Sequence, residues 1–224
     1  MEKNKQMETL IAFHGQQAIK DKYLARIAEH RKLDHLAKGQ TGQNGRGCAV
    51  WCTLNTYSHA AYEPELGIPR GLARLEDGLF ESLPIADAME WPQRFLASIH
   101  PGADLSLVLP RFFVWLLTDP TDGVIKFARS EQSRNAIQSV SDAYARRIAG
   151  EIVSPREFQA GAADAADAAD AAYAAADSAA DAAADAAADA AADAAGFEAR
   201  KKQADKIIEL LATAPQACLE RIPE

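Results

Sequence analysis

Residues 162–195 constrain the fold of this chain more than any other part of its sequence. They contain 24 alanines, eight aspartates, one tyrosine and one serine, with no basic residue, glycine or proline. Alanine has the highest helix propensity of all residues, so this segment is expected to form a helix with little tertiary help. No stretch of the chain shows the clean two-residue alternation of apolar and polar residues that is typical of a strand. The sequence therefore predicts an all-α protein.

Elsewhere, apolar residues recur at the three- and four-residue steps of amphipathic helices. We expect helices over residues 16–38, 69–83 and 105–117, one that starts at Pro92, and one or two between Val124 and Ile148. The most apolar of these, 105–117, is shorter than the roughly 20 residues that cross a bilayer. The first ten residues have no apolar run behind a basic start. We therefore expect neither a membrane span nor a secretory signal, and a cytoplasmic location.

The C-terminal part of the sequence begins with a helix-start signal. Residues 154–157, Ser-Pro-Arg-Glu, form a capping box, in which Ser and Glu bond reciprocally to backbone N–H groups. An unbroken helix from there through the last apolar residues would be about 87 Å long, so breaks are expected at Gly161 and Gly196. We predict a helical core domain over 1–153, with the Ala/Asp-rich helix and a short helix that folds back in 154–224.

The net charge of −8 arises in the Ala/Asp segment, because the rest of the chain holds 24 acidic and 24 basic residues once its eight aspartates are subtracted from 32. Such a balance gives no bulk attraction to nucleic acid or anionic lipid. On a helical wheel the aspartates lie within an arc of about 160°. Three roles stay open: a solvated helix that adds solubility, an acidic DNA mimic that inhibits a DNA-binding enzyme, or a surface that docks a partner protein or a second copy through Asp177, Asp181, Asp185, Asp189 and Asp193.

Cys48 and Cys52 follow a glycine-rich loop and would share one face of a helix. A helix N-terminus lowers the pKa of a thiol, and His59 and Glu63 or Glu65 follow as a base and its orienting group. Cys48, His59 and Glu63 are thus candidate catalytic residues of a thiol hydrolase. Alternatively, Cys48, Cys52 and His59 supply three ligands to Zn²⁺, or the thiols are simply buried.

Other titratable residues favour structural roles. His30 lies on the apolar stripe of the first helix, where Asp34 is expected to pair with it one turn later. Glu76 and Asp77, with Glu81, form either a solvated helix face or a paired-carboxylate site. The chain contains no GxGxxG, P-loop or HExxH motif, so the sequence indicates no organic cofactor and favours a non-enzymatic protein.

The block GCAVWCTLNTYSHAAYEPELGIPRGLARLEDGLFESLP, residues 47–84, resembles the signature block of a group of uncharacterised bacterial and phage proteins. Similar proteins share an early KDKYLAR-like helix and an alanine-rich helix before a leucine-containing end, here KIIELLATAP. The resemblance covers roughly residues 10–100 and 160–212. It carries no known activity, but it implies a protein-binding role in immunity or phage–host conflict. Similar sequences carry Arg, Ser or Trp in place of these aspartates, which favours packing or solubility over DNA mimicry.

Overall fold

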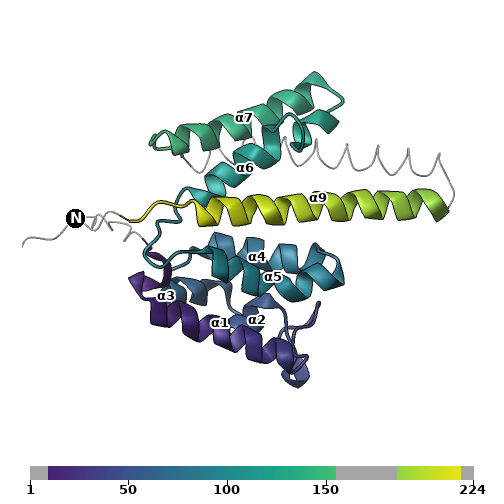
Figure 1. Cartoon of the computed structure of the whole chain (residues 1–224). Helices are drawn as coiled ribbons and strands as arrows, with labels where there is room; N and C mark the ends of the chain where they lie inside the picture. The colour runs from purple at the N-terminus through teal and green to yellow at the C-terminus, as the bar shows by residue number, and fades with distance from the viewer. Residues whose placement is uncertain (1–9, 155–185, 218–224) are drawn as a thin grey trace, which may run out of the picture. The chain divides into compact units, whose positions relative to one another are not determined.

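The structure is a computed structural model that describes residues 10–154 and 186–217, with side chains in the second range from residue 195 onward. The described residues form helices joined by turns and loops (Figure 1). Their β-structure is limited to isolated bridges between single residues, such as Ile11 with Asp104. The predicted all-α class is therefore confirmed. No helix among the described residues has the length and apolar character needed to cross a membrane.

In the described part of the chain the α-helices are α1 (Gln17–Lys32), α2 (Ala49–Leu54), α3 (Tyr62–Leu66), α4 (Arg70–Ser82), α5 (Ile85–Ser98), α6 (Val108–Thr118), α7 (Glu131–Ile148) and α9 (Ala186–Ala212). Short 3₁₀ turns lie between them: η1 (Ala12–Gly15), η2 (Gln43–Gly45), η3 (His59–Ala61) and η4 (Val124–Phe127).

The predicted start at Pro92 is wrong, because α5 begins at Ile85 and Pro92 lies inside it. Pro84 occupies the N-cap, where a proline's fixed φ suits the start of a helix and its missing N–H is not needed. Pro92 removes one interior backbone hydrogen bond, but its ring is buried among the apolar side chains of α5. Packing therefore compensates for the lost bond.

The internal contacts of the chain divide it into two compact units. Unit 1 contains Met1–Leu109 and Ile207–Glu224, and unit 2 contains Pro110–Lys206. The boundary expected at 153/154 falls inside unit 2. The division into 1–153 and 154–224 stays a prediction about which parts fold independently.

Unit 1 is built around α1, α2, α4 and α5. Helix α5 packs against both α1 and α4, and α2 contacts all three of the others. Its core is aromatic and fully buried, with Trp91, Tyr23, Tyr62, Phe13, Phe80 and Phe95 among the largest side chains. Burying an aromatic side chain of this size stabilises a fold by about 1.5–3 kcal/mol. The core thus holds α2, a helix of only six residues, in a fixed position.

The end of the described chain completes unit 1. Ile207 and Leu211, on the last turns of α9, are buried. Beyond α9, the Asp104 N–H donates to the Pro215 carbonyl at 2.8 Å, and the Ala217 N–H donates to the Gly102 carbonyl at 2.9 Å. The prediction that the C-terminal stretch folds back on the core is confirmed for these residues.

The predicted break at Gly196 is wrong, since α9 continues through it to Ala212. No separate short C-terminal helix exists in the described residues, because that stretch is the last part of α9. One interior glycine costs a helix only about 1 kcal/mol, and the neighbouring alanines favour helix. The break expected at Gly161 and most of the 154–157 capping box lie outside the described residues.

In unit 2, side chains of α6 and α7 contact each other, and Lys202 of α9 donates to Asp122 Oδ1 in the loop after α6 at 2.7 Å. The rings of Phe113 and Tyr144 stack at a centroid distance of 5.0 Å. The hydroxyls of Thr118 and Ser141 are 3.0 Å apart. Ser130 caps α7, because its hydroxyl accepts a hydrogen bond from the Ser133 N–H at 3.0 Å.

Candidate functional site

The glycine-rich loop before α2 accommodates the indole of Trp51. A Cβ atom added at Gly47 would lie 2.7 Å from the Trp51 side chain, and one at Gly42 would overlap the indole ring. Gly42 also has a φ of 109°, which side chains rarely tolerate. The loop therefore closes tightly over Trp51 and delivers Cys48 to the N-cap of α2.

The two thiols are closed off from solvent. Cys48 is 2% exposed and Cys52 0%. The pKa of each thiol is raised to about 12, by burial at Cys52 and by burial together with the neighbouring Asp77 carboxyl at Cys48. The expected lowering of the Cys48 pKa by the helix N-terminus is wrong, because desolvation outweighs the dipole of a six-residue helix. An activated thiolate, which a thiol hydrolase needs, is therefore not supported.

His59 is paired with Asp77 rather than with Glu63. Its Nε2 atom donates to Asp77 Oδ2 at 3.0 Å, and the Tyr57 hydroxyl donates to the same oxygen at 3.1 Å. The other carboxylate oxygen, Asp77 Oδ1, is buried and has no hydrogen-bond partner. Asp77 therefore has one oxygen bound twice and one oxygen unbound, beside the Cys48 thiol.

Glu76, the neighbour of Asp77 on α4, is fully buried. Its Oε2 atom accepts a hydrogen bond from the Tyr62 hydroxyl at 2.6 Å, and its backbone carbonyl accepts one from Trp91 Nε1 at 2.9 Å. Its Oε1 atom has no partner. Burial raises the pKa of Glu76 to about 8, with Asp77 adding to the rise and the Tyr62 bond opposing it. We call Cys48, Tyr57, His59, Tyr62, Glu76 and Asp77 the Asp77 cluster.

The remaining predicted site residues have structural partners elsewhere. Glu63 Oε1 accepts the Arg70 N–H at 3.1 Å and so caps the start of α4, while Glu65 accepts the Tyr23 hydroxyl. Cys52 donates to the Gly47 carbonyl at 3.5 Å. The predicted set is therefore only partly brought together: Cys48 and His59 both meet Asp77, and the other residues do not join them.

Two further expectations about titratable residues are wrong. His30 bonds to His35 and Asn55 instead of Asp34, whose carboxylate pairs with Arg46 at 3.1 Å. Asp34 has a φ of 57°, which ends the helical path before its side chain can lie one turn beyond His30.

Glu76 and Asp77 do not belong to a solvated face of α4, because both are buried. Glu81 is exposed, and its two oxygens accept the Gly39 N–H at 3.1 and 2.9 Å. The sequence contains a signal for Glu76, since Leu72, Glu76 and Phe80 follow one another at four-residue steps on the buried face of α4. An acid on an apolar stripe needs a partner.

The interaction residues predicted in the Ala/Asp segment remain predictions. Asp177, Asp181 and Asp185 lie outside the described residues, and Asp189 and Asp193 lie on α9 where side chains are not described. Docking and DNA mimicry through these residues both stay open.

In the residues that the structure describes, no group of three or more His, Cys, Asp and Glu side chains has a geometry that could hold a metal ion. Comparison with known protein families, curated proteins and solved structures gave no match. The resemblance to bacterial and phage proteins therefore also stays a prediction.

Proposed function

We propose that this protein is a metal-binding module that holds one divalent transition-metal ion at Cys48, His59 and Asp77. The observation that carries this proposal is the pair of buried carboxyl oxygens, Glu76 Oε1 and Asp77 Oδ1, that have no hydrogen-bond partner. Buried polar atoms are almost always satisfied, and an unsatisfied one calls for a water or an ion.

The charge balance of the cluster also favours a cation. It contains two carboxyl groups, a thiol and two phenols, while His59 is its only basic side chain. Burying a carboxylate without a counter-charge costs several kcal/mol, so the group either takes up a proton or binds a cation. Glu76 takes up a proton, because burial raises its pKa to about 8. For Asp77 we propose the second.

The ligand types select zinc over harder cations. Thiolate and imidazole suit Zn²⁺, whereas Mg²⁺ and Ca²⁺ prefer oxygen ligands. Three protein ligands leave a fourth position for water. Binding requires local change, because His59 Nε2 now donates to Asp77 and must give up that proton, as must the Cys48 thiol. Tyr57 can keep its bond to Asp77 and orient the carboxylate. A cytoplasmic location, where thiols stay reduced, is part of this proposal.

Native mass spectrometry of the reduced full chain after incubation with Zn²⁺ tests this assignment. One bound ion is expected, and it should be lost in Cys48→Ser, His59→Gln and Asp77→Asn. The matched control is Cys52→Ala, because this thiol is equally buried but bonds to the Gly47 carbonyl. With Co²⁺, a thiolate charge-transfer band should appear in the wild type and in Cys52→Ala, and should vanish in Cys48→Ser.

A chain that remains metal-free with excess Zn²⁺ contradicts the proposal. Loss of the ion in Cys52→Ala but not in Asp77→Asn would instead support the set first predicted, Cys48, Cys52 and His59. Circular dichroism of each variant separates loss of the ion from loss of the fold.

A second candidate is protein binding through the Ala/Asp segment and the helix that follows it. One observation favours it: residues 195–199 of α9 are exposed, and they include Phe197, which is 44% exposed. An exposed aromatic residue on a helix is a common anchor at interfaces. Pull-downs with the full chain and with Phe197→Ser should recover different proteins. Identical recoveries, also after deletion of residues 162–185, count against this role.

A further inference from the structure

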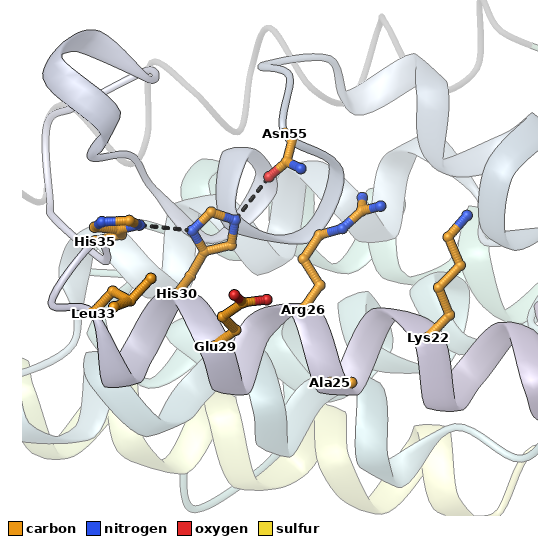
Figure 2. A pocket seen from close by; sticks show the side chains of 8 residues that line it. All are labelled: Lys22, Ala25, Arg26, Glu29, His30, Leu33, His35 and Asn55. Carbon is orange, nitrogen blue, oxygen red and sulfur yellow. Dashed lines mark hydrogen bonds between the residues drawn. The ribbon is translucent and has the colours of Figure 1, made fainter.

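A hollow of about 460 Å³ lies along α1 in unit 1, on the side where α2 ends. It is separate from the Asp77 cluster and shares no residue with it. Figure 2 shows Lys22, Arg26, Glu29 and His30 on α1, Leu33 and His35 just beyond its end, and Asn55 reaching in from the C-cap of α2. The polar and charged side chains that line it are Lys22, Arg26, His30, His35, Glu29 and Asn55.

His30 is held in one orientation at the middle of this hollow (Figure 2). Its Nε2 atom is 2.7 Å from Asn55 Oδ1, and its Nδ1 atom is 3.1 Å from His35 Nδ1. An amide oxygen only accepts, so His30 Nε2 carries a proton, and in the neutral ring His30 Nδ1 accepts from His35 Nδ1. The ring also contacts Trp51 at a centroid distance of 5.0 Å. The imidazole is thus fixed before any ligand arrives.

The two permanent cations of the hollow are also fixed near each other. Lys22 Nζ and the Arg26 guanidinium lie over the ring of Tyr23, at 4.9 and 5.0 Å from its centroid. Arg26 Nη1 donates to the Thr53 carbonyl at 2.9 Å, which uses one of the five guanidinium N–H groups. Glu29 makes no ion pair with either cation among the described residues. Neither cation is therefore paired with a carboxylate in the part of the chain that the structure describes.

We propose that the α1 hollow is a binding site for a small molecule that carries an oxyanion, a phosphate or carboxylate group held between Lys22 and Arg26. Guanidinium N–H groups match the geometry of both oxyanions, and the ammonium of lysine adds a point charge. Both cations lie within 5.0 Å of the centroid of the Tyr23 ring, and we place the anion in contact with both of them.

The rest of the ligand is apolar. Leu33, at the other end of the hollow, is 54% exposed, and Ala25 and the His30 ring lie between the two ends. An apolar group attached to the oxyanion would cover this leucine and gain burial free energy. The hollow is thus polar at the Lys22 end and apolar at the Leu33 end, and it favours an aryl or alkyl phosphate over inorganic phosphate.

Isothermal titration of the full chain with inorganic phosphate and with phenyl phosphate tests this inference. Phenyl phosphate should bind about tenfold more tightly, and Leu33→Asn should remove most of that difference. Lys22→Gln and Arg26→Gln should each weaken both ligands about tenfold. The control is Arg31→Gln, which removes the same charge from α1 but at a residue that pairs with Glu90 outside the hollow. Imidazole NMR signals of His30 should shift on binding.

Three results overturn the proposal. The first is the absence of saturable binding by either probe. The second is an equal loss of affinity in Arg31→Gln and Lys22→Gln, since this would indicate attraction by net charge alone. The third is equal affinity for the two phosphates, which would remove the apolar part of the site. Lys22 is exposed and has no hydrogen bond in the described structure, so its variant keeps the fold and every outcome is interpretable.

Discussion

The two sites lie at opposite ends of one six-residue helix and are opposite in charge and exposure. Cys48, at the N-cap of α2, belongs to a buried group of acids with one imidazole, whereas Asn55, at its C-cap, borders an accessible group of bases with one carboxylate. Burial raises the pKa of the Cys48 thiol and of the Glu76 carboxyl and so favours their neutral forms. The difference in solvation therefore separates the two proposals: a cation in the buried Asp77 cluster, and an anion in the accessible α1 hollow.

Thiol reactivity gives the largest expected effect. With a pKa of about 12 for Cys48 and Cys52, both should react with iodoacetamide about a thousandfold more slowly in the native chain than in the unfolded chain near neutral pH. Mass spectrometry of the labelled peptides measures each cysteine separately. Fast labelling of Cys48 alone in the native chain would contradict the burial of this thiol and would support the thiol-hydrolase hypothesis.

The pH dependence of stability separates the two sites next. Glu76 has a pKa of about 8 in the folded chain against 4.5 for the ordinary value, so the folded state holds its proton more tightly. The stability that this proton adds to the folded state is complete below about pH 4.5 and is lost as the pH rises through 8, with a total change of about 5 kcal/mol.

Denaturant unfolding of the metal-free chain between pH 5 and 9, with a chelator present, measures this loss. Glu76→Gln should flatten the profile. Glu29→Gln, in the exposed hollow, should leave it unchanged. A wild-type profile that rises toward pH 9 would show that Glu76 is ionised in the fold.

Gly42→Ala should disturb both sites at once, because Trp51 contacts His30 in the hollow and the loop that positions Cys48. Overlap with the indole and the positive φ should together lower the free energy of unfolding by about 3 kcal/mol. Gly45→Ala is the matched control: its φ is 74° but the space around it is open, so only about 1 kcal/mol is expected. Equal losses would mean that Trp51 does not fill the loop.

The smallest effect concerns the tether of His30. Asn55→Gly keeps the left-handed backbone but removes the oxygen that holds the imidazole, and should cost about 1 kcal/mol in the free energy of unfolding. Asn44→Gly, at an exposed asparagine with a φ of 57°, should be nearly neutral. NMR should show a change in the His30 tautomer in Asn55→Gly and no change in Asn44→Gly. Equal behaviour of the two variants would contradict the role of Asn55 in holding His30.

Helices were predictable where apolar spacing and turn residues agree, and the site was predictable only in part. The expected 69–83 helix is Arg70–Ser82, and the 16–38 helix is Gln17–Lys32. Cys48 and His59, which the sequence singles out, both meet Asp77, but this residue lies 18 positions beyond His59. Such a pairing depends on how α4 packs against η3, which no local pattern encodes. Glu76 was within reach of the sequence, because it interrupts an apolar stripe.

The other wrong predictions share one physical cause. Residues that favour helix ends cost less free energy than the packing of the surrounding helix provides. Pro92 was expected to start a helix and Gly196 to end one, yet both lie inside helices. Each residue costs a helix a few kcal/mol at most, and the surrounding residues outweigh that cost. His30 was paired with Asp34 on helical spacing alone, although the chain leaves the helical path before that residue.

The pairing of residues 102–104 with residues 215–217 has a consequence for biosynthesis. Unit 1 is assembled from both sides of unit 2 in the sequence, so its core is completed only after the segment through residue 217 has been synthesised. The alanine–aspartate repeat lies between the two parts. A shift of reading frame within that repetitive stretch would replace Ile207, Leu211 and the segment that pairs with Gly102 and Asp104, whereas gain or loss of whole codons would leave them encoded. Unit 1 can therefore fold completely only if the repeat has been translated in frame.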